Sequence, residues 1–223
     1  MVQYADWGER AARWSGIRSE TVDVHGTKVH YLVTDQTRTS GVPVHLLVPN
    51  PANSASNWLD VLAELRSHAH AVAVDLPGTI AGHTAPSNRR AAGIETNVLF
   101  LRDFADALEL DRVVVHGWSA GGMVALLFAD QAPERVAGLV LVAPALPPAL
   151  SEGEARMWRT LGRAGLAQRP GWNLVVLHRA GHAPPFEVPA DYARIVLDWC
   201  GRGGGRGRFR TYDPSLVRRV LSH

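Results

Sequence analysis

One serine lies in a sequence context that can make its hydroxyl a nucleophile. Ser119 is in the middle of residues 117–121, Gly-Trp-Ser-Ala-Gly, between an apolar β-branched run and an apolar helical pattern. A Gly-x-Ser-x-Gly string between a strand and a helix predicts a nucleophile elbow, a strained turn that exposes the serine side chain. Glycine suits the flanking positions because a β-carbon there would collide with the neighbouring strand or helix.

Two other interpretations of residues 117–121 would give this stretch a different role. The stretch is also compatible with a glycine-rich turn of a doubly wound sheet that carries no chemistry. A phosphate-binding loop is not expected, because neither Gly-x-Gly-x-x-Gly nor a P-loop lysine is present and Lys28 is the only lysine in the chain. The elements around the serine therefore decide between an elbow and a plain turn.

These elements alternate in the order of an α/β fold. Continuous apolar runs predict buried strands at 44–48, 71–74, 113–116 and 136–142. Apolar residues at helical spacing predict helices at 94–110 and 190–199. Two β-rich runs around His25 and Gly26 predict a hairpin. The alternation predicts a mostly parallel sheet flanked by helices, whose chemistry lies beyond the carboxyl ends of the strands, where Ser119 falls.

The amino-acid composition limits which classes of protein the chain can belong to. The chain has 223 residues, 46% of them hydrophobic, which suits one domain with a buried core. No apolar run is long enough for a membrane span, and the first 20 residues lack the apolar stretch of a secretory signal, so we expect a cytoplasmic protein. Cys200 is the only cysteine, so neither an internal disulfide nor a cysteine-based zinc site is expected.

Charge separates the end of the chain from the rest. Residues 201–223 carry a net charge of +5 and residues 1–200 a net charge of −3. The glycine- and arginine-rich segment has no apolar periodicity, so we expect a domain at 1–200 and a disordered tail at 201–223. A basic nucleic-acid-binding face on the domain is not expected, and RNA association through the tail is kept as an alternative.

Several motifs in order resemble the α/β-hydrolase superfamily, from about Arg18 to Trp199. Residues 44–58 are similar to its third strand and the following loop. Residues 75–78 (Asp-Leu-Pro-Gly) are similar to the turn after its fourth strand, and residues 133–141 to its sixth strand. The elbow, Ala180-Gly181-His182 and Glu187-x-Pro189 are similar to the family's elbow and histidine loop. The resemblance implies an α/β-hydrolase fold.

The resemblance also implies Ser119 as nucleophile and His182 as general base. A serine hydroxyl is a poor nucleophile until a base accepts its proton, and histidine titrates near neutral pH. Dehalogenase-like and epoxide-hydrolase-like members use an aspartate, so a serine suggests acyl chemistry through an acyl-enzyme. The alternative for His182 is a plain loop residue, and His116 and His178 are expected to be structural.

The expected oxyanion donors depart from the family pattern. In the family, the residue after a His-Gly pair at the third strand donates its main-chain N–H. Residues 48–51 are Val-Pro-Asn-Pro here, which puts Pro51, a residue without an N–H, at the donor position. We expect Ala120 to supply one N–H and the Asn50 side chain to supply the second.

The acid of a catalytic triad has no clear position. Only residues 143–172 separate the predicted sixth strand from the last strand at 173–177, and they contain no Gly-x-x-Asp. The chain therefore resembles a truncated α/β hydrolase without the seventh strand and without a full cap domain. Glu152 and Glu154 are candidates for the acid; the alternative is that they are solvated residues in the first turn of a helix.

The sequence thus predicts a serine hydrolase that acts on a small-molecule acyl substrate such as an ester, thioester or amide. Neither a metal nor an organic cofactor is expected, and neither a membrane nor a nucleic acid is expected as a partner. The substrate and the oligomeric state are left open. The rival hypothesis is a catalytically silent α/β-hydrolase scaffold with a binding role.

Overall fold

The computed structural model describes residues 12–78, 82–84, 93–144 and 181–201. The chain divides into two compact units, one made of residues 1–145 and 180–196 and the other of residues 146–179 and 197–223. Of the second unit, the structure describes only residues 197–201. The predicted strand at 173–177 lies outside the described residues, as do the tail beyond residue 201, Glu152, Glu154 and His178.

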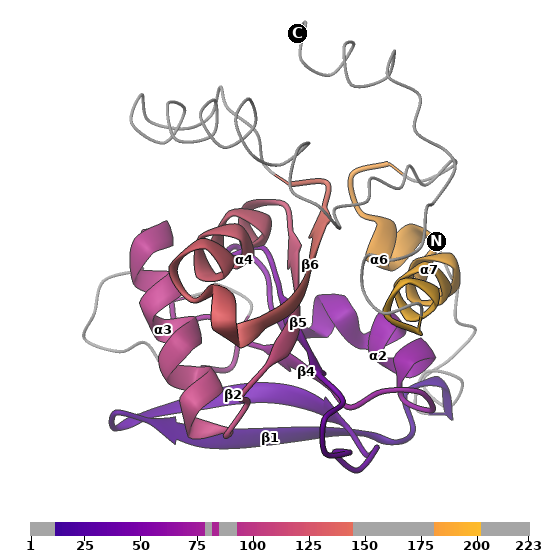
Figure 1. Ribbon diagram of the computed structural model, residues 1–223, viewed down its shortest axis with the longest axis horizontal. Coiled ribbons are helices and arrows are strands. Elements are labelled where there is room, and N and C mark those ends of the chain that lie inside the picture. Colours follow the sequence, from indigo (N-terminus) through magenta and orange to yellow (C-terminus); the bar gives the residue numbers. More distant parts are fainter. Residues whose placement is uncertain (1–11, 79–81, 85–92, 145–180, 202–223) are drawn as a thin grey trace, which may run out of the picture. The chain divides into compact units, whose positions relative to one another are not determined.

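Six strands form one sheet in the spatial order β1-β2-β4-β3-β5-β6 (Figure 1). The four strands from β4 to β6 are parallel, and β2 pairs antiparallel with both β1 and β4. The predicted mostly parallel sheet is therefore confirmed. The strands span β1 (Ile17–Val24), β2 (Thr27–Thr34), β3 (Val44–Val48), β4 (Ala71–Val74), β5 (Val113–Trp118) and β6 (Val136–Val142).

The predicted hairpin joins β1 to β2 through a two-residue turn. His25 and Gly26 both have positive φ, 50° and 80°. A turn with two such residues matches the right-handed twist of the flanking strands. The carboxylate of Asp23 accepts a hydrogen bond from the Gly26 N–H at 2.8 Å, which closes the turn.

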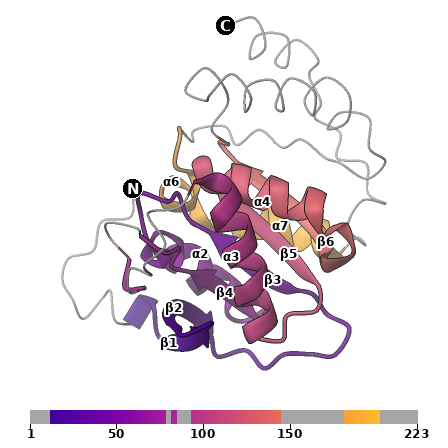
Figure 2. The same cartoon turned by 90° about the vertical axis from the view of Figure 1, so that its left-hand side faces the viewer.

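Helices cover both faces of the sheet. α3 (Ile94–Ala107) and α4 (Ala120–Gln131) lie on one face, and α2 (Leu59–Leu65), α6 (Pro184–Glu187) and α7 (Pro189–Gly201) lie on the other (Figures 1 and 2). Two short 3₁₀ helices, η1 (Ala55–Trp58) and η2 (Pro133–Arg135), precede α2 and β6. Because both faces are covered, every residue of β3, β4 and β5 is buried, as their continuous apolar runs predict.

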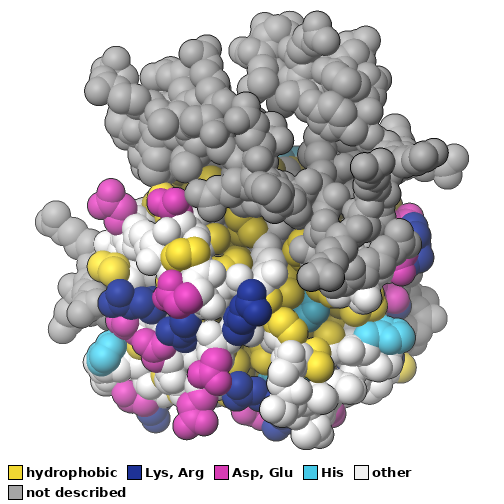
Figure 3. All heavy atoms as spheres, viewed as in Figure 1, with side chains coloured by type: hydrophobic (Ala, Val, Ile, Leu, Met, Phe, Trp, Pro, Cys, Tyr) yellow, Lys and Arg dark blue, Asp and Glu magenta, His cyan; other side chains and the backbone are white. Residues whose placement is uncertain are grey.

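The described surface carries charged side chains of both signs together with a group of hydrophobic side chains at the centre of the face shown in Figure 3. Acidic and basic side chains are interspersed on the face shown in Figure 3. The only large hydrophobic side chains exposed among the described residues are Val42 and Leu99. None of the described helices is long and apolar enough to cross a lipid bilayer.

Strand register brings three strand ends together. Val48 at the end of β3 lies beside Gly117, and Val142 at the end of β6 lies beside Trp118. Ser119 follows directly, so the turn after β5 is bordered on both sides by the carboxyl ends of its neighbours. This edge of the sheet is where an α/β fold places a binding site.

Candidate active site

Ser119 occupies a strained backbone conformation between β5 and α4. Its φ of 53° and ψ of −122° lie in a region that non-glycine residues rarely adopt, and such strain occurs mainly at functional sites. The turn is tight because its glycines touch neighbouring backbone. A β-carbon on Gly117 would lie 2.5 Å from the carbonyl oxygen of Gly121, and one on Gly121 would lie 2.3 Å from that of Pro49.

Main-chain hydrogen bonds hold the turn in place. The Ser119 N–H donates to the carbonyl of Val142 at 3.0 Å, which extends the ladder between β5 and β6. The Gly122 N–H donates to the Ser119 carbonyl at 3.0 Å. The N–H of Ala120, at the start of α4, has no hydrogen-bond partner among the described residues. Ala120 therefore presents a free donor beside the serine, where the helix dipole favours negative charge.

The two side chains singled out by the sequence lie together. The Ser119 hydroxyl oxygen is 3.1 Å from Nε2 of His182, within hydrogen-bond distance. Ser119 is buried, whereas His182 is exposed on the segment that precedes α6. A buried hydroxyl and an exposed imidazole from positions 63 residues apart thus share one hydrogen bond.

Trp118 connects the elbow to the segment that carries His182. Its indole N–H donates to the His182 carbonyl at 2.8 Å. Its ring lies 6.0 Å from the His182 ring and 5.5 Å from the ring of Phe186 in an edge-to-face arrangement. The residue directly before the serine therefore anchors the backbone of the histidine.

Glu187 holds the same segment from the other side. Its carboxylate accepts main-chain hydrogen bonds from Gly181 and, at 3.0 Å, from Ala183, the two residues that flank His182. These bonds lower the pKa of Glu187, so the carboxylate is ionised at neutral pH. We name residues 181–187, with this clamp, the histidine loop.

Asn50 lies in the loop after β3 that touches the elbow at Pro49. Its side-chain oxygen accepts the Ala52 N–H at 3.0 Å and its carbonyl accepts the Asn53 N–H at 2.8 Å, which fixes a compact turn. Within the described part of the chain, neither the Asn50 amide NH₂ nor its main-chain N–H has a hydrogen-bond partner. Asn50 thus carries two unused donor groups in this loop.

A chain of three buried polar side chains lies beneath the elbow. His45 of β3 and His116 of β5 are 2.9 Å apart between Nδ1 and Nε2, and His116 Nδ1 is 2.6 Å from the hydroxyl of Tyr192 on α7. Burial lowers the pKa of His45 to about 4, and burial together with the neighbouring His45 lowers the pKa of His116 well below its usual range. Both imidazoles are therefore neutral at pH 7, and His116 is buried and bonded as a structural residue should be.

Other predicted site residues are not brought to Ser119 by the described structure. Glu152 and Glu154 lie outside the described residues, and within those residues no carboxylate bonds to His182 Nδ1. Sequence reasoning missed Trp118 and gave Glu187 no role. Glu187 belongs to the motif Glu187-x-Pro189, so the sequence contained a signal for its role. The contact between Trp118 and His182 can be seen only in the folded structure.

Comparisons with known proteins agree on one family. Residues 40–167 match the model of the Alpha/beta hydrolase family. The 2-hydroxy-6-oxo-2,4-heptadienoate hydrolase of Pseudomonas putida is 38% identical over 104 residues, which are 46% of this chain and 37% of that protein. A monoacylglycerol lipase of Homo sapiens is 30% identical over 124 residues, 55% of this chain and 36% of that protein. The matches thus span little more than a third of the length of these relatives.

A solved structure shares the fold. The crystal structure of a predicted CIB-like hydrolase from Thermoplasma acidophilum superimposes with a TM-score of 0.67 at 23% sequence identity. The match covers 82% of this chain and 97% of that one. At this identity the likeness concerns the arrangement of the elements.

Proposed function

The chain belongs to the alpha/beta hydrolase family, and we propose that it is a serine hydrolase that cleaves an acyl bond. The observation that carries the proposal is the 3.1 Å distance between the Ser119 hydroxyl and His182 Nε2, on a backbone strained at the serine. A nucleophile within hydrogen-bond distance of a base is the arrangement that activates a hydroxyl.

The reaction proceeds in two halves. Ser119 Oγ forms a bond to the acyl carbon while its proton passes to His182 Nε2. The tetrahedral intermediate then collapses, and the leaving group departs with that proton. Water, deprotonated in turn by His182, attacks the acyl-enzyme and releases the acid. Serine and histidine are regenerated, so no cofactor is consumed.

Two groups are assigned to the oxyanion of the intermediate. The N–H of Ala120 is one donor, supported by its position after the nucleophile at the start of α4. Asn50 is the second, through its side-chain NH₂, which has no other partner among the described residues. Trp118 and Glu187 position the base through the backbone of the histidine loop.

Two of the relatives support a carbonyl-containing substrate. One is named for an oxo-dienoate and another for a monoacylglycerol, and both compounds contain a carbon that a serine can attack. A small-molecule acyl compound is therefore the proposed substrate class.

A fluorophosphonate probe, which reacts with activated serines, tests the proposal on the full chain. We expect labelling of the unaltered protein and of Ser15→Ala, an exposed serine with no role in the site, and no labelling of Ser119→Ala. In ester hydrolysis Asn50→Ala lowers kcat by about 100-fold, as the loss of an oxyanion donor does. A folded protein that resists the probe, or a Ser119→Ala variant that is still labelled, favours the silent scaffold with a binding role.

A further inference from the structure

A second cluster of chemically capable side chains lies at the end of β4. Nδ1 of His30, a carboxylate oxygen of Asp75 and a ring nitrogen of His83 all lie within 4.8 Å of one another. His30 belongs to β2, Asp75 follows β4 directly, and His83 belongs to the described segment 82–84. The proposed hydrolase mechanism uses none of the three.

We propose that His30, Asp75 and His83 form a binding site for a divalent transition-metal ion of the zinc type. Two imidazoles and one carboxylate are a ligand set that zinc accepts, with solvent in the fourth position. The buried Asp75 supplies one negative charge, and His83, with 74% of its side chain exposed, forms the open side through which an ion enters.

The distances suit an ion with a small adjustment. Tetrahedral zinc with bonds of about 2.1 Å places its ligand atoms about 3.4 Å apart. Asp75 Oδ2 lies 2.7 Å from His30 Nδ1 and 3.5 Å from His83 Nδ1. His83 Nδ1 is already at a suitable distance from Asp75 Oδ2, so the adjustment is a separation of His30 Nδ1 from Asp75 Oδ2 by about 0.7 Å. At 3.5 Å its Nδ1 makes no hydrogen bond to Asp75, so its lone pair is available.

Groups behind the ligands hold them in place. Ser19 Oγ lies 2.7 Å from His30 Nε2, so it can accept a hydrogen bond from the Nε2–H when Nδ1 binds an ion. A ligating histidine generally needs such a partner on its other nitrogen. Main-chain N–H groups of Ala55 and, at 2.8 Å, of His83 donate to the Asp75 carboxylate and fix its orientation.

One threonine links all three ligand residues. Thr84, next to His83, accepts the His30 N–H at 3.0 Å and donates its hydroxyl proton to the Asp75 carbonyl at 2.8 Å. Thr84 is buried, so these bonds are shielded from water. The three ligand backbones are thus connected before any ion binds, which reduces the ordering that binding requires.

Titration of the metal-stripped, untagged full chain with Zn²⁺ and with Co²⁺ tests the site. We expect one equivalent to bind, with the visible absorption of four-coordinate Co²⁺. His83→Ala weakens binding by at least about 100-fold, and Ser19→Ala, which removes the outer partner, weakens it by about 10- to 100-fold. Both side chains are exposed, so neither variant is expected to unfold the protein.

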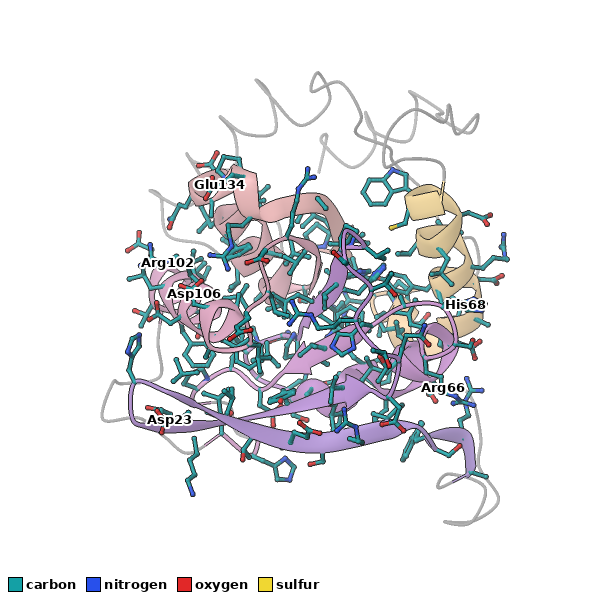
Figure 4. All side chains as sticks on the ribbon, turned by 60° about the horizontal axis from the view of Figure 1, so that its bottom comes forward. Asp23, Arg66, His68, Arg102, Asp106 and Glu134 are labelled. Carbon is teal, nitrogen blue, oxygen red and sulfur yellow. The ribbon has the colours of Figure 1, made fainter. Side chains whose placement is uncertain are left out.

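The matched control is His68→Ala. His68 is also exposed and lies in the turn that follows α2 (Figure 4), so its loss should leave the affinity unchanged. Absence of binding by the unaltered chain overturns the proposal, and so does an affinity that His83→Ala leaves unchanged. Either result would mean that His30 and Asp75 form only a hydrogen-bonded pair.

Discussion

Two turns meet at the candidate active site, and different forces fix them. The elbow around Ser119 is fixed by backbone packed against backbone, since Gly117 and Gly121 leave no room for a β-carbon. The histidine loop is fixed by two side chains, Trp118 and Glu187, which bind its main chain. A turn fixed by steric contact accepts almost no added atom. A turn fixed by hydrogen bonds can lose one bond and keep the others. Substitutions in the elbow should therefore lower the stability of the fold. Substitutions in the histidine loop should instead disturb the alignment of His182 with Ser119.

The largest effect is expected from Gly121→Ala, which tests the steric side of the comparison. The new β-carbon would lie 2.3 Å from the Pro49 carbonyl oxygen, a backbone atom that cannot move aside cheaply. We expect the free energy of unfolding in urea to fall by about 3 kcal/mol or more.

Gly93→Ala is the matched control for this substitution. Nothing lies within 4 Å of its new β-carbon, so its stability should change by no more than about 1 kcal/mol. Equal stability losses in the two variants would show that packing around Gly121 does not fix the elbow.

An intermediate loss of stability is expected at low pH, through the two buried histidines on the strands beneath the elbow. An unfolded histidine takes up a proton near pH 6.5, whereas His45 in the folded protein does so near pH 4. The unfolded state binds more protons between these values, so the free energy of unfolding falls as the pH decreases from 6.5 to 4. At about 1.4 kcal/mol per pH unit, His45 alone accounts for a loss of about 3 kcal/mol. Burial of His116 acts in the same direction.

Urea unfolding at pH 7, 6 and 5 measures this slope. His45→Gln removes one of the two contributing groups and should flatten the dependence, whereas the exposed His68→Gln should leave it unchanged. A free energy of unfolding that increases as the pH is lowered from 7 to 5 would contradict neutral imidazoles beneath the elbow.

The smallest effect on the fold is expected from Glu187→Gln, which tests the clamp. An amide offers one oxygen, so one of the two main-chain N–H groups loses its acceptor and faces an NH₂ group. We expect the unfolding midpoint to stay within error and kcat for an ester substrate to fall by up to about 100-fold, as a misplaced base would cause.

Asp191→Asn, an exposed carboxylate on α7, is the control for charge alone. Its activity should equal that of the unaltered protein. If Glu187→Gln and Asp191→Asn have the same activity, the clamp does not align His182.

The parts of the molecule that the sequence predicted are those in which neighbours along the chain decide the structure. The glycines around Ser119, the apolar run of β3 and the His25–Gly26 turn each carry their own conformational reason. The tie between Trp118 and His182 spans 64 residues, and that between His116 and Tyr192 spans 76. No local pattern encodes such contacts, so they required the fold. The roles of Glu152 and Glu154, outside the described residues, stay predictions.

The hydrogen bond from the Ser119 N–H to the Val142 carbonyl has a consequence for how this architecture can diversify. It uses the last residue of β6 to support the serine, and everything downstream of Val142 begins beyond that support. Side-chain substitutions downstream of Val142 therefore leave this main-chain support of the serine in place.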